Sequence, residues 1–266
     1  MTRTDDDRLW LRRFDEAPQP AARLVCLPHA GGSASYFRGV SRALAPRIEV
    51  LAVQAPGRQD RRREPCVESI PDLADAVAAR LLDRADTPIA LFGHSMGALV
   101  AFEIARRLTA IGVRPLALFV SGRRAPFTHR AEETHLLDDD ALLDHLRSLD
   151  GTDGRILSDP DMVSAILPVT RADYRAIGAY RYLPGPPLTM PIHVHLGDAD
   201  PHVTVAEAEQ WRQHTTDEFA VHVYPGGHFY LEEHSARLIR SLDAVIVGQT
   251  HTGRAESSTT SPVAPR

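Results

Sequence analysis

A serine between two glycines is the pattern with the clearest chemical meaning in this chain. Gly93-His-Ser95-Met-Gly97 has the form G-x-S-x-G and directly follows the apolar run 89–92. A sharp turn from strand to helix lifts the serine hydroxyl clear of a sheet, and the helix N-terminus presents free N–H groups to the reacting centre. We therefore predict Ser95 to be a nucleophile, with an unreactive turn serine as the alternative.

A serine nucleophile needs a base and an acid, and two later loops offer them. His228 ends the segment Pro225-Gly-Gly-His228, directly after the apolar run 220–224. Asp198 and Asp200 share the loop after the run 192–196, and either carboxylate could reach the imidazole. We predict His228 as the base and Asp200 as the acid. Hydrolases with a serine in such a strand-to-helix turn usually place the acid three residues after the glycine that closes the strand. Asp198 could instead cap the turn.

The negative oxygen of a tetrahedral intermediate needs two backbone N–H donors, which typically lower the barrier by roughly 3 to 4 kcal/mol each. Met96, directly after the nucleophile, is expected to provide the first. The second should come from the loop after an early strand, and Pro28-His-Ala-Gly-Gly32 is a glycine-rich turn in that place. We predict that Ala30 is this donor. The alternative is a tight connection without catalytic role.

Short apolar runs alternate with longer amphipathic segments, which predicts a mostly parallel central sheet flanked by helices. The predicted strands are 23–27, 49–53, 89–92, 116–120, 192–196 and 220–224. Helices are expected at 97–109, 205–214 and 236–247, and another begins at Ser69, which can cap it with Asp72 in the capping-box position. Together with the order serine, acid, histidine along the chain, this pattern predicts an α/β class protein with the α/β-hydrolase fold.

The segment 124–187 interrupts that alternation, because it is long and contains no strand-like run. Leucines at 142, 143, 146 and 149 form one helical face, and Asp159-Pro160 can begin a second helix. We expect one domain over 1–247 in which 124–187 is a helical lid insertion, the alternative being a helix pair that only packs on the core. Residues 248–266 have no apolar periodicity, so we expect a disordered tail there.

Composition excludes several classes of function. The 266 residues are 43% hydrophobic with a formal net charge of −5, which gives no electrostatic reason to expect nucleic acid. No run reaches the roughly 18 apolar residues that a membrane span needs, so we expect a cytoplasmic protein that does not bind membranes. His193 and His195 alternate on one strand, but two ligands without a third favour packing over metal binding. We expect neither a metal nor a cofactor.

Several segments together resemble the type II thioesterases that accompany polyketide and nonribosomal peptide synthases. They are Pro28-His-Ala-Gly-Gly32, Gln54-Ala-Pro-Gly-Arg58, Gly93-His-Ser-Met-Gly97, Leu167-Pro-Val-Thr-Arg-Ala-Asp-Tyr174, Gly197-Asp-Ala-Asp200 and Gly226-Gly-His-Phe-Tyr230. The resemblance covers nearly the whole chain. It implies a stand-alone, monomeric enzyme that removes aberrant acyl groups from the phosphopantetheine arm of an acyl carrier protein or peptidyl carrier protein.

Other interpretations remain open alongside that one. A general carboxylesterase, an acyl-CoA thioesterase or a cyclising thioesterase would use the same three residues, although the short independent chain argues against the cyclising enzyme. A malonyl-type acyltransferase also has a serine in this pattern but lacks the aspartate loop and the later Gly-Gly-His. A non-enzymatic binding module would usually have lost the serine, the histidine or the glycines. Arg58, Arg61, Arg62 and Arg63 form a basic cluster that could dock an acidic carrier protein.

Overall fold

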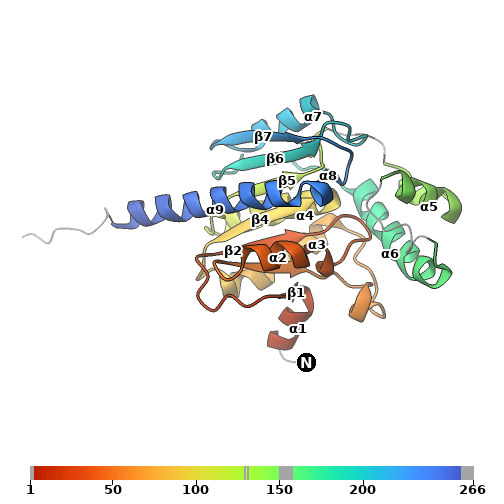
Figure 1. Cartoon of the computed structure of the whole chain (residues 1–266), viewed down its shortest axis with the longest axis horizontal. Helices are drawn as coiled ribbons and strands as arrows, with labels where there is room; N and C mark the ends of the chain where they lie inside the picture. Colours follow the sequence, from red (N-terminus) through yellow and green to blue (C-terminus); the bar gives the residue numbers. More distant parts are fainter. Residues whose placement is uncertain (1–2, 129, 131, 150–157, 259–266) are drawn as a thin grey trace, which may run out of the picture.

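The computed structural model describes residues 3–128, 130, 132–149 and 158–258. These form a seven-stranded sheet in the order β1-β3-β2-β4-β5-β6-β7, parallel except where β1 pairs antiparallel with β3 (Figure 1). The strands are β1 Leu11–Arg12, β2 Ala22–Leu27, β3 Ile48–Val53, β4 Ile89–His94, β5 Leu118–Ser121, β6 Ile192–Gly197 and β7 Phe219–Tyr224. All six predicted strands are confirmed, and the predicted fold class with them.

The central strands are buried on both faces, which explains why they are continuous apolar runs instead of alternating ones. Along β2, Leu24 and Cys26 belong to one core cluster, and Val25 and Leu27 belong to the other. Helices α2, α8 and α9 pack over the first cluster, while α3 and α4 lie on the opposite face (Figure 1). The sheet is therefore packed on both faces, and the predicted site residues lie in loops that follow its strands.

The helices agree with most of the expected positions. Those of the described residues are α1 Arg3–Trp10, α2 Arg38–Leu44, α3 Ile70–Leu81, α4 Met96–Ala110, α5 Asp139–Ser148, α6 Pro160–Ala179, α7 Val205–Glu209, α8 Tyr230–Glu233 and α9 Ser235–Ser258. Short 3-10 turns are η1 Ala34–Phe37, η2 Gln59–Arg61, η3 Leu82–Arg84, η4 Thr134–Leu136 and η5 Gln210–His214. The predicted caps are confirmed, since Ser69 accepts from the Asp72 N–H and Asp159 caps α6.

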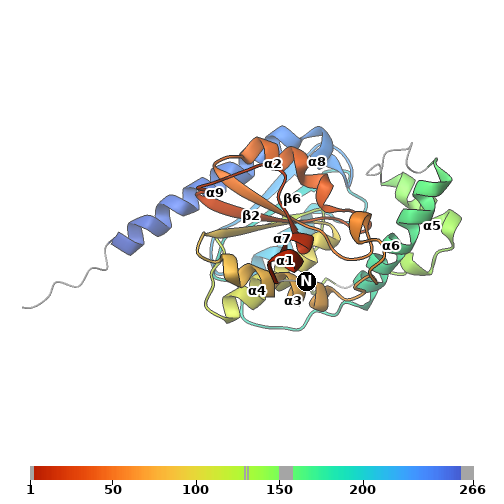
Figure 2. The same cartoon turned by 90° about the horizontal axis from the view of Figure 1, so that it is seen from below.

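Between β5 and β6 the chain leaves the sheet and forms η4, α5 and α6. In both views α5 and α6 lie beside the end of the sheet and cover neither of its faces (Figures 1 and 2). Leu142, Leu146 and Leu149 are buried, as the predicted helical face requires. The helical content expected for 124–187 is therefore present in its described part, and residues 129, 131 and 150–157 lie outside it.

The C-terminal helix differs from the expectation. Disorder was predicted from residue 248, but α9 continues to Ser258, and only 259–266 lie outside the described residues. Among the residues of α9 whose side chains the structure describes, Ile246 is the last fully buried hydrophobic one, and the helix beyond it projects away from the sheet (Figure 1). A helix that is already nucleated by packing gains one hydrogen bond for each further residue, which extends it past its core contacts. Apolar periodicity alone does not reveal such an extension.

In the part of the chain that the structure describes, no helix is long and apolar enough to span a lipid bilayer. Cys26 is buried in β2 and Cys66 is partly exposed, and both are free thiols. Burial raises the pKa of both thiols, so Cys26 behaves as a small apolar side chain in the core.

Candidate active site

Ser95 occupies a strained turn between β4 and α4. Its backbone has φ 55° and ψ −115°, a conformation that side chains rarely adopt. The two glycines of the motif are needed because the backbone passes very close to them. A Cβ on Gly93 would collide with the carbonyl of Gly97, and a Cβ on Gly97 would collide with the carbonyl of Leu27. The motif thus packs the start of α4 directly against the end of β2.

A network of buried hydrogen bonds supports this turn. The carbonyl of Ser121 accepts a hydrogen bond from the Ser95 N–H at 2.8 Å. The Ser121 hydroxyl lies 3.0 Å from Nδ1 of His94 and 2.7 Å from the Tyr230 hydroxyl. Sequence reasoning assigned no role to Ser121, because a serine at the end of β5 has no distinctive sequence signal.

The predicted acid and the predicted base lie next to each other. Asp200 Oδ2 is 2.9 Å from Nδ1 of His228, and their side chains are 0% and 3% exposed. Asp198 instead accepts a hydrogen bond from the Gly226 N–H at 3.0 Å, which joins the two loops. At Gly197 a Cβ would collide with the carbonyl of Gly226, so the acid loop and the histidine loop pack backbone against backbone.

Ser95 and His228 line one cavity of about 230 Å³. Leu149, Tyr174 and Ile177, which lie in or beside α5 and α6, line the same cavity. Among the hydrogen bonds of the described residues, none joins the Ser95 hydroxyl to His228. Catalytic hydrogen bonds are often long in unliganded structures and tighten with substrate. The structure therefore brings the serine and the histidine to one cavity without joining them directly.

The predicted oxyanion donors follow the ends of two neighbouring strands. Leu27 of β2 is paired with Gly93 of β4, and Ala30 and Met96 each lie three residues further along. The hydrogen bonds of the described residues give no acceptor to the N–H of Ala30 or to that of Met96. Met96 is the first residue of α4, where N–H groups lack partners within the helix. Neither N–H thus has a hydrogen-bond acceptor among the described residues, which the predicted role of both requires.

Other imidazoles surround His228. The rings of His94 and His202 both lie 4.9 Å from the ring of His228 between centroids. Burial, reinforced by the charge that His228 can acquire, lowers the pKa of His202 to about 4 and that of His94 well below its usual range. These two neighbours therefore stay neutral at physiological pH.

Comparison with known proteins identifies the family. The family model described as Thioesterase domain matches residues 22–246. The chain belongs to the thioesterase family. It is 50% identical to the thioesterase PikA5 of Streptomyces venezuelae, over 86% of this chain and 82% of that protein.

Solved structures agree with this assignment. The thioesterase superposes on BorB, a type II thioesterase from the borrelidin biosynthetic cluster, with a TM-score of 0.84 and 47% identity over 90% of this chain and 98% of that one. RedJ, a thioesterase from the prodiginine pathway of Streptomyces coelicolor, superposes with a TM-score of 0.81. It is 41% identical over 86% of this chain and 94% of that one. The resemblance seen in the sequence is thereby confirmed.

The basic cluster of the thioesterase is divided between buried and exposed side chains. Arg58 and Arg61 are only 5% and 4% exposed, whereas Arg62 and Arg63 are exposed. Arg61 donates to the carbonyl of Gln54 at 2.8 Å, and its guanidinium lies over the ring of Trp10. The docking hypothesis is therefore wrong for Arg58 and Arg61, because both hold the chain together internally.

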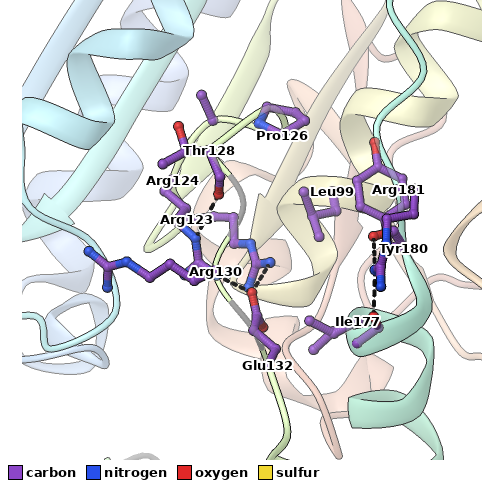
Figure 3. A pocket seen from close by; sticks show the side chains of 12 residues that line it. Leu99, Arg123, Arg124, Pro126, Thr128, Arg130, Glu132, Ile177, Tyr180 and Arg181 are labelled. Atoms are coloured by element: carbon purple, nitrogen blue, oxygen red, sulfur yellow. Dashed lines mark hydrogen bonds and ion pairs between the residues drawn. The ribbon is translucent and has the colours of Figure 1, made fainter.

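Three further arginines lie around Glu132, in a region that continues the Ser95 cavity. Arg123 makes two hydrogen bonds to Glu132 at 2.7 and 3.2 Å, and Arg124 also contacts this carboxylate (Figure 3). Burial alone would raise the pKa of Glu132, but the two guanidinium groups lower it overall. Arg130 pairs with Glu207. The wall of the thioesterase cavity next to the serine is thus polar, with its charges largely paired.

The histidines considered as metal ligands, His193 and His195, pack against neighbouring aromatic rings. His195 stacks on His222 with ring centroids 4.5 Å apart and lies 3.0 Å from the Tyr224 hydroxyl, while His193 stacks on Phe119. Within the described ranges of the thioesterase, no group of three histidine, cysteine or acidic side chains is arranged to hold a metal ion.

Proposed function

We propose that this thioesterase hydrolyses acyl thioesters held on the phosphopantetheine arm of acyl or peptidyl carrier proteins, and so removes aberrant acyl groups during polyketide or nonribosomal peptide assembly. The observation that carries the proposal is the buried Asp200–His228 hydrogen bond beside the cavity that Ser95 lines. The names of similar proteins support the substrate class. YbtT, which is 31% identical, is a type II thioesterase from the yersiniabactin NRPS/PKS biosynthetic pathway.

Each of the three side chains has a distinct role in the proposed reaction. Ser95 attacks the thioester carbonyl while His228 takes its proton, and Asp200 holds the imidazole and stabilises its positive charge. Ser95 and His228 line one cavity, and the Ser95 side chain makes its hydrogen bond to His228 when the substrate enters. The Ala30 and Met96 N–H groups receive the negative oxygen of the intermediate.

The thiol then leaves and takes the proton from His228, and an acyl group remains on Ser95. Water enters, gives a proton to His228 and attacks the acyl-serine, which releases the carboxylic acid and restores the hydroxyl. A thiol with a pKa of about 8.5 leaves far more readily than an alkoxide, so His228 is acid enough for this step. No metal or cofactor takes part in the proposed steps.

The insertion 124–187 serves as a lid in this proposal, within a single domain that extends over 1–247. Its support is that Tyr174 and Ile177 of α6 line the same cavity as the serine. An insertion beside the carboxyl ends of parallel strands lies where substrates enter α/β proteins. The lid helices then contact the acyl group and exclude bulk water from it.

Carrier proteins loaded with acyl groups of different length would test the function directly. Release of each acyl group is followed by intact mass, with the unmodified chain and Ser95→Ala side by side. We expect release by the former and a loss of about 10⁴-fold or more in the latter. Ser33→Ala changes a partly exposed serine that contacts Ser35, and it provides a control that keeps activity. Full turnover by Ser95→Ala would overturn the mechanism.

A comparison of leaving groups separates a thioesterase from a general carboxylesterase. The same acyl group is offered as a pantetheine thioester and as an oxygen ester, and kcat/KM is measured for both. We expect the thioester to be preferred by at least about tenfold, because the thiol is the better leaving group. Equal values would favour the general esterase.

A further inference from the structure

The loop that carries Ala30 is a tight turn with a defined peptide orientation. The N–H of Gly32 donates to the carbonyl of His29 at 3.0 Å, and Gly31 has φ +76°. A type II turn has this hydrogen bond and needs a positive φ at its third residue. The central peptide of this turn joins Ala30 to Gly31 and carries the Gly31 N–H. The Ala30 N–H belongs to the peptide before it, so its position depends on whether the turn as a whole is held in place.

A carboxylate from the lid insertion holds this central peptide. Asp173 lies in α6 and is 0% exposed, and its Oδ2 accepts a hydrogen bond from the N–H of Gly31 at 2.8 Å. The next residue of the same helix, Tyr174, lines the Ser95 cavity. Residues 31 and 173 are far apart in sequence, so only the packing of α6 against the sheet edge brings them together.

The guanidinium of Arg58 binds both the Asp173 carboxylate and the turn, and we call these two side chains the clamp. Arg58 donates from Nη2 to Asp173 Oδ1 at 2.9 Å and from Nη1 to Oδ2 at 3.1 Å. The same Nη1 donates to the carbonyl of Gly32 at 3.0 Å. The pair therefore binds the turn at two points, the N–H of its third residue and the carbonyl of its fourth.

Close packing prevents the turn from shifting sideways. A Cβ on Gly31 would collide with the Thr170 hydroxyl, one helical turn before Asp173. Thr170 is 2% exposed and Arg58 is 5% exposed, so water does not compete for these hydrogen bonds. Hydrogen bonds that involve an ionised partner are shorter and stronger than neutral ones.

We infer that Arg58 and Asp173 are positioning residues. They hold the whole turn in place, which fixes the position of the Ala30 N–H, in the peptide before the clamped one, for the negative oxygen of the intermediate, and they tie this position to the seated position of α6. The inference rests on the proposed function, because it needs the tetrahedral intermediate at Ser95. If α6 moves away from the sheet edge, the turn loses both clamping contacts at once. Oxyanion stabilisation is then complete only when the lid helix is in place.

The test removes the clamp while keeping its volume apolar. A double variant, Arg58→Met with Asp173→Leu, avoids leaving one buried charge unpaired, and such replacements are often neutral for stability. We expect kcat for acyl-pantetheine to fall by about 10- to 100-fold with KM within about threefold, since loss of a whole oxyanion donor costs about 10² to 10³. Thermal unfolding should stay within a few degrees of the unmodified chain.

Two inhibitors distinguish positioning from general damage. An alkyl trifluoromethyl ketone forms a tetrahedral adduct with the serine and needs the oxyanion donors, whereas a thioether analogue of the substrate only fills the cavity. We expect the ketone to lose affinity by the same factor as kcat and the thioether to bind unchanged. Unchanged kcat and ketone affinity would overturn the inference, as would equal losses for both inhibitors.

A matched control exists on the same helix. Arg175 of α6 pairs with the exposed Glu68. Like the clamp, this ion pair joins α6 to the segment after β3, but it makes no hydrogen bond to the turn. Arg175→Gln is expected to leave kcat and ketone affinity unchanged. Should the double variant fail to fold, Asp173→Asn keeps the size of the side chain, and at least a fivefold fall in kcat and ketone affinity is expected. Turnover that persists in Ser95→Ala would instead refute the proposed function itself.

Discussion

Asp200, and not Asp198, lies against the imidazole of His228, with 2.9 Å between Oδ2 and Nδ1. Asp198 accepts a hydrogen bond from Gly226 and helps to join the two loops. Asp200→Asn should therefore lower kcat by about 10⁴, because an amide stabilises the wrong tautomer of the histidine. Asp198→Asn should lower kcat by less than about tenfold. Steady-state kinetics on acyl-pantetheine decide between the two, and the reverse order would reassign the acid.

Gly97 is predicted to be intolerant of even one methyl group. Its Cβ would collide with the carbonyl of Leu27, whose strand leads into the turn that carries Ala30. Gly97→Ala should separate the two oxyanion donors and reduce kcat by at least about 100-fold. Gly39→Ala is the control, since a Cβ at Gly39 in α2 has nothing within 4 Å. This control should unfold at the same or a slightly higher temperature.

Acid should destabilise this protein before its carboxylates titrate. Burial first, and then the charge of Arg106, lowers the pKa of His214 to about 4, while its pKa in the unfolded chain is about 6.5. The unfolded chain then binds more protons, so stability falls as pH drops from 6.5 toward 4. By pH 5, His214 alone should cost about 2 kcal/mol of unfolding free energy.

A substitution at that histidine provides the test. The His214 ring packs against the rings of Phe102, Trp211 and Tyr182, so His214→Phe keeps an aromatic side chain without a titrating group. Denaturant unfolding between pH 7.5 and 5 should show a shallower loss of stability in the variant. Parallel curves for the two proteins would contradict the assignment of His214. His193, whose pKa burial lowers to about 4, should contribute in the same direction.

For Arg62 and Arg63, the exposed residues of the basic cluster, docking of the carrier protein stays a prediction. Charge reversal at both, Arg62→Glu with Arg63→Glu, should raise KM for carrier-bound acyl groups at least about threefold and leave acyl-pantetheine kinetics unchanged. An unchanged KM for the carrier would remove these residues from any docking surface.

Arg61 should behave differently from its neighbours. Charge reversal at this buried side chain removes its hydrogen bond to Gln54 and its contact with the Trp10 ring, and adds a carboxylate beside Glu64. Arg61→Glu should cost about 3 kcal/mol or more of unfolding free energy, which denaturant unfolding measures. A variant as stable as the unmodified chain would show that these contacts contribute little.

The sequence by itself determined the elements that the backbone forms locally. The G-x-S-x-G pattern after an apolar run indicated the turn at Ser95, because glycine and strand requirements are properties of neighbouring residues. The caps at Ser69 and Asp159 were predictable for the same reason, since a cap and the N–H groups that donate to it lie within four residues. The extent of α9 was not, because helix propagation beyond Ile246 leaves no apolar pattern.

Only the tertiary structure decided which distant groups meet. Asp198 and Asp200 are equivalent in composition and lie in one loop, and the path of the chain past Gly226 gave each a different partner. Arg58 and Arg62 belong to one basic run, yet packing against α6 buried the first and left the second in solvent. A contact across 115 residues, such as that of Arg58 with Asp173, depends on how helices pack on the sheet edge, and that packing has no signature in the local sequence.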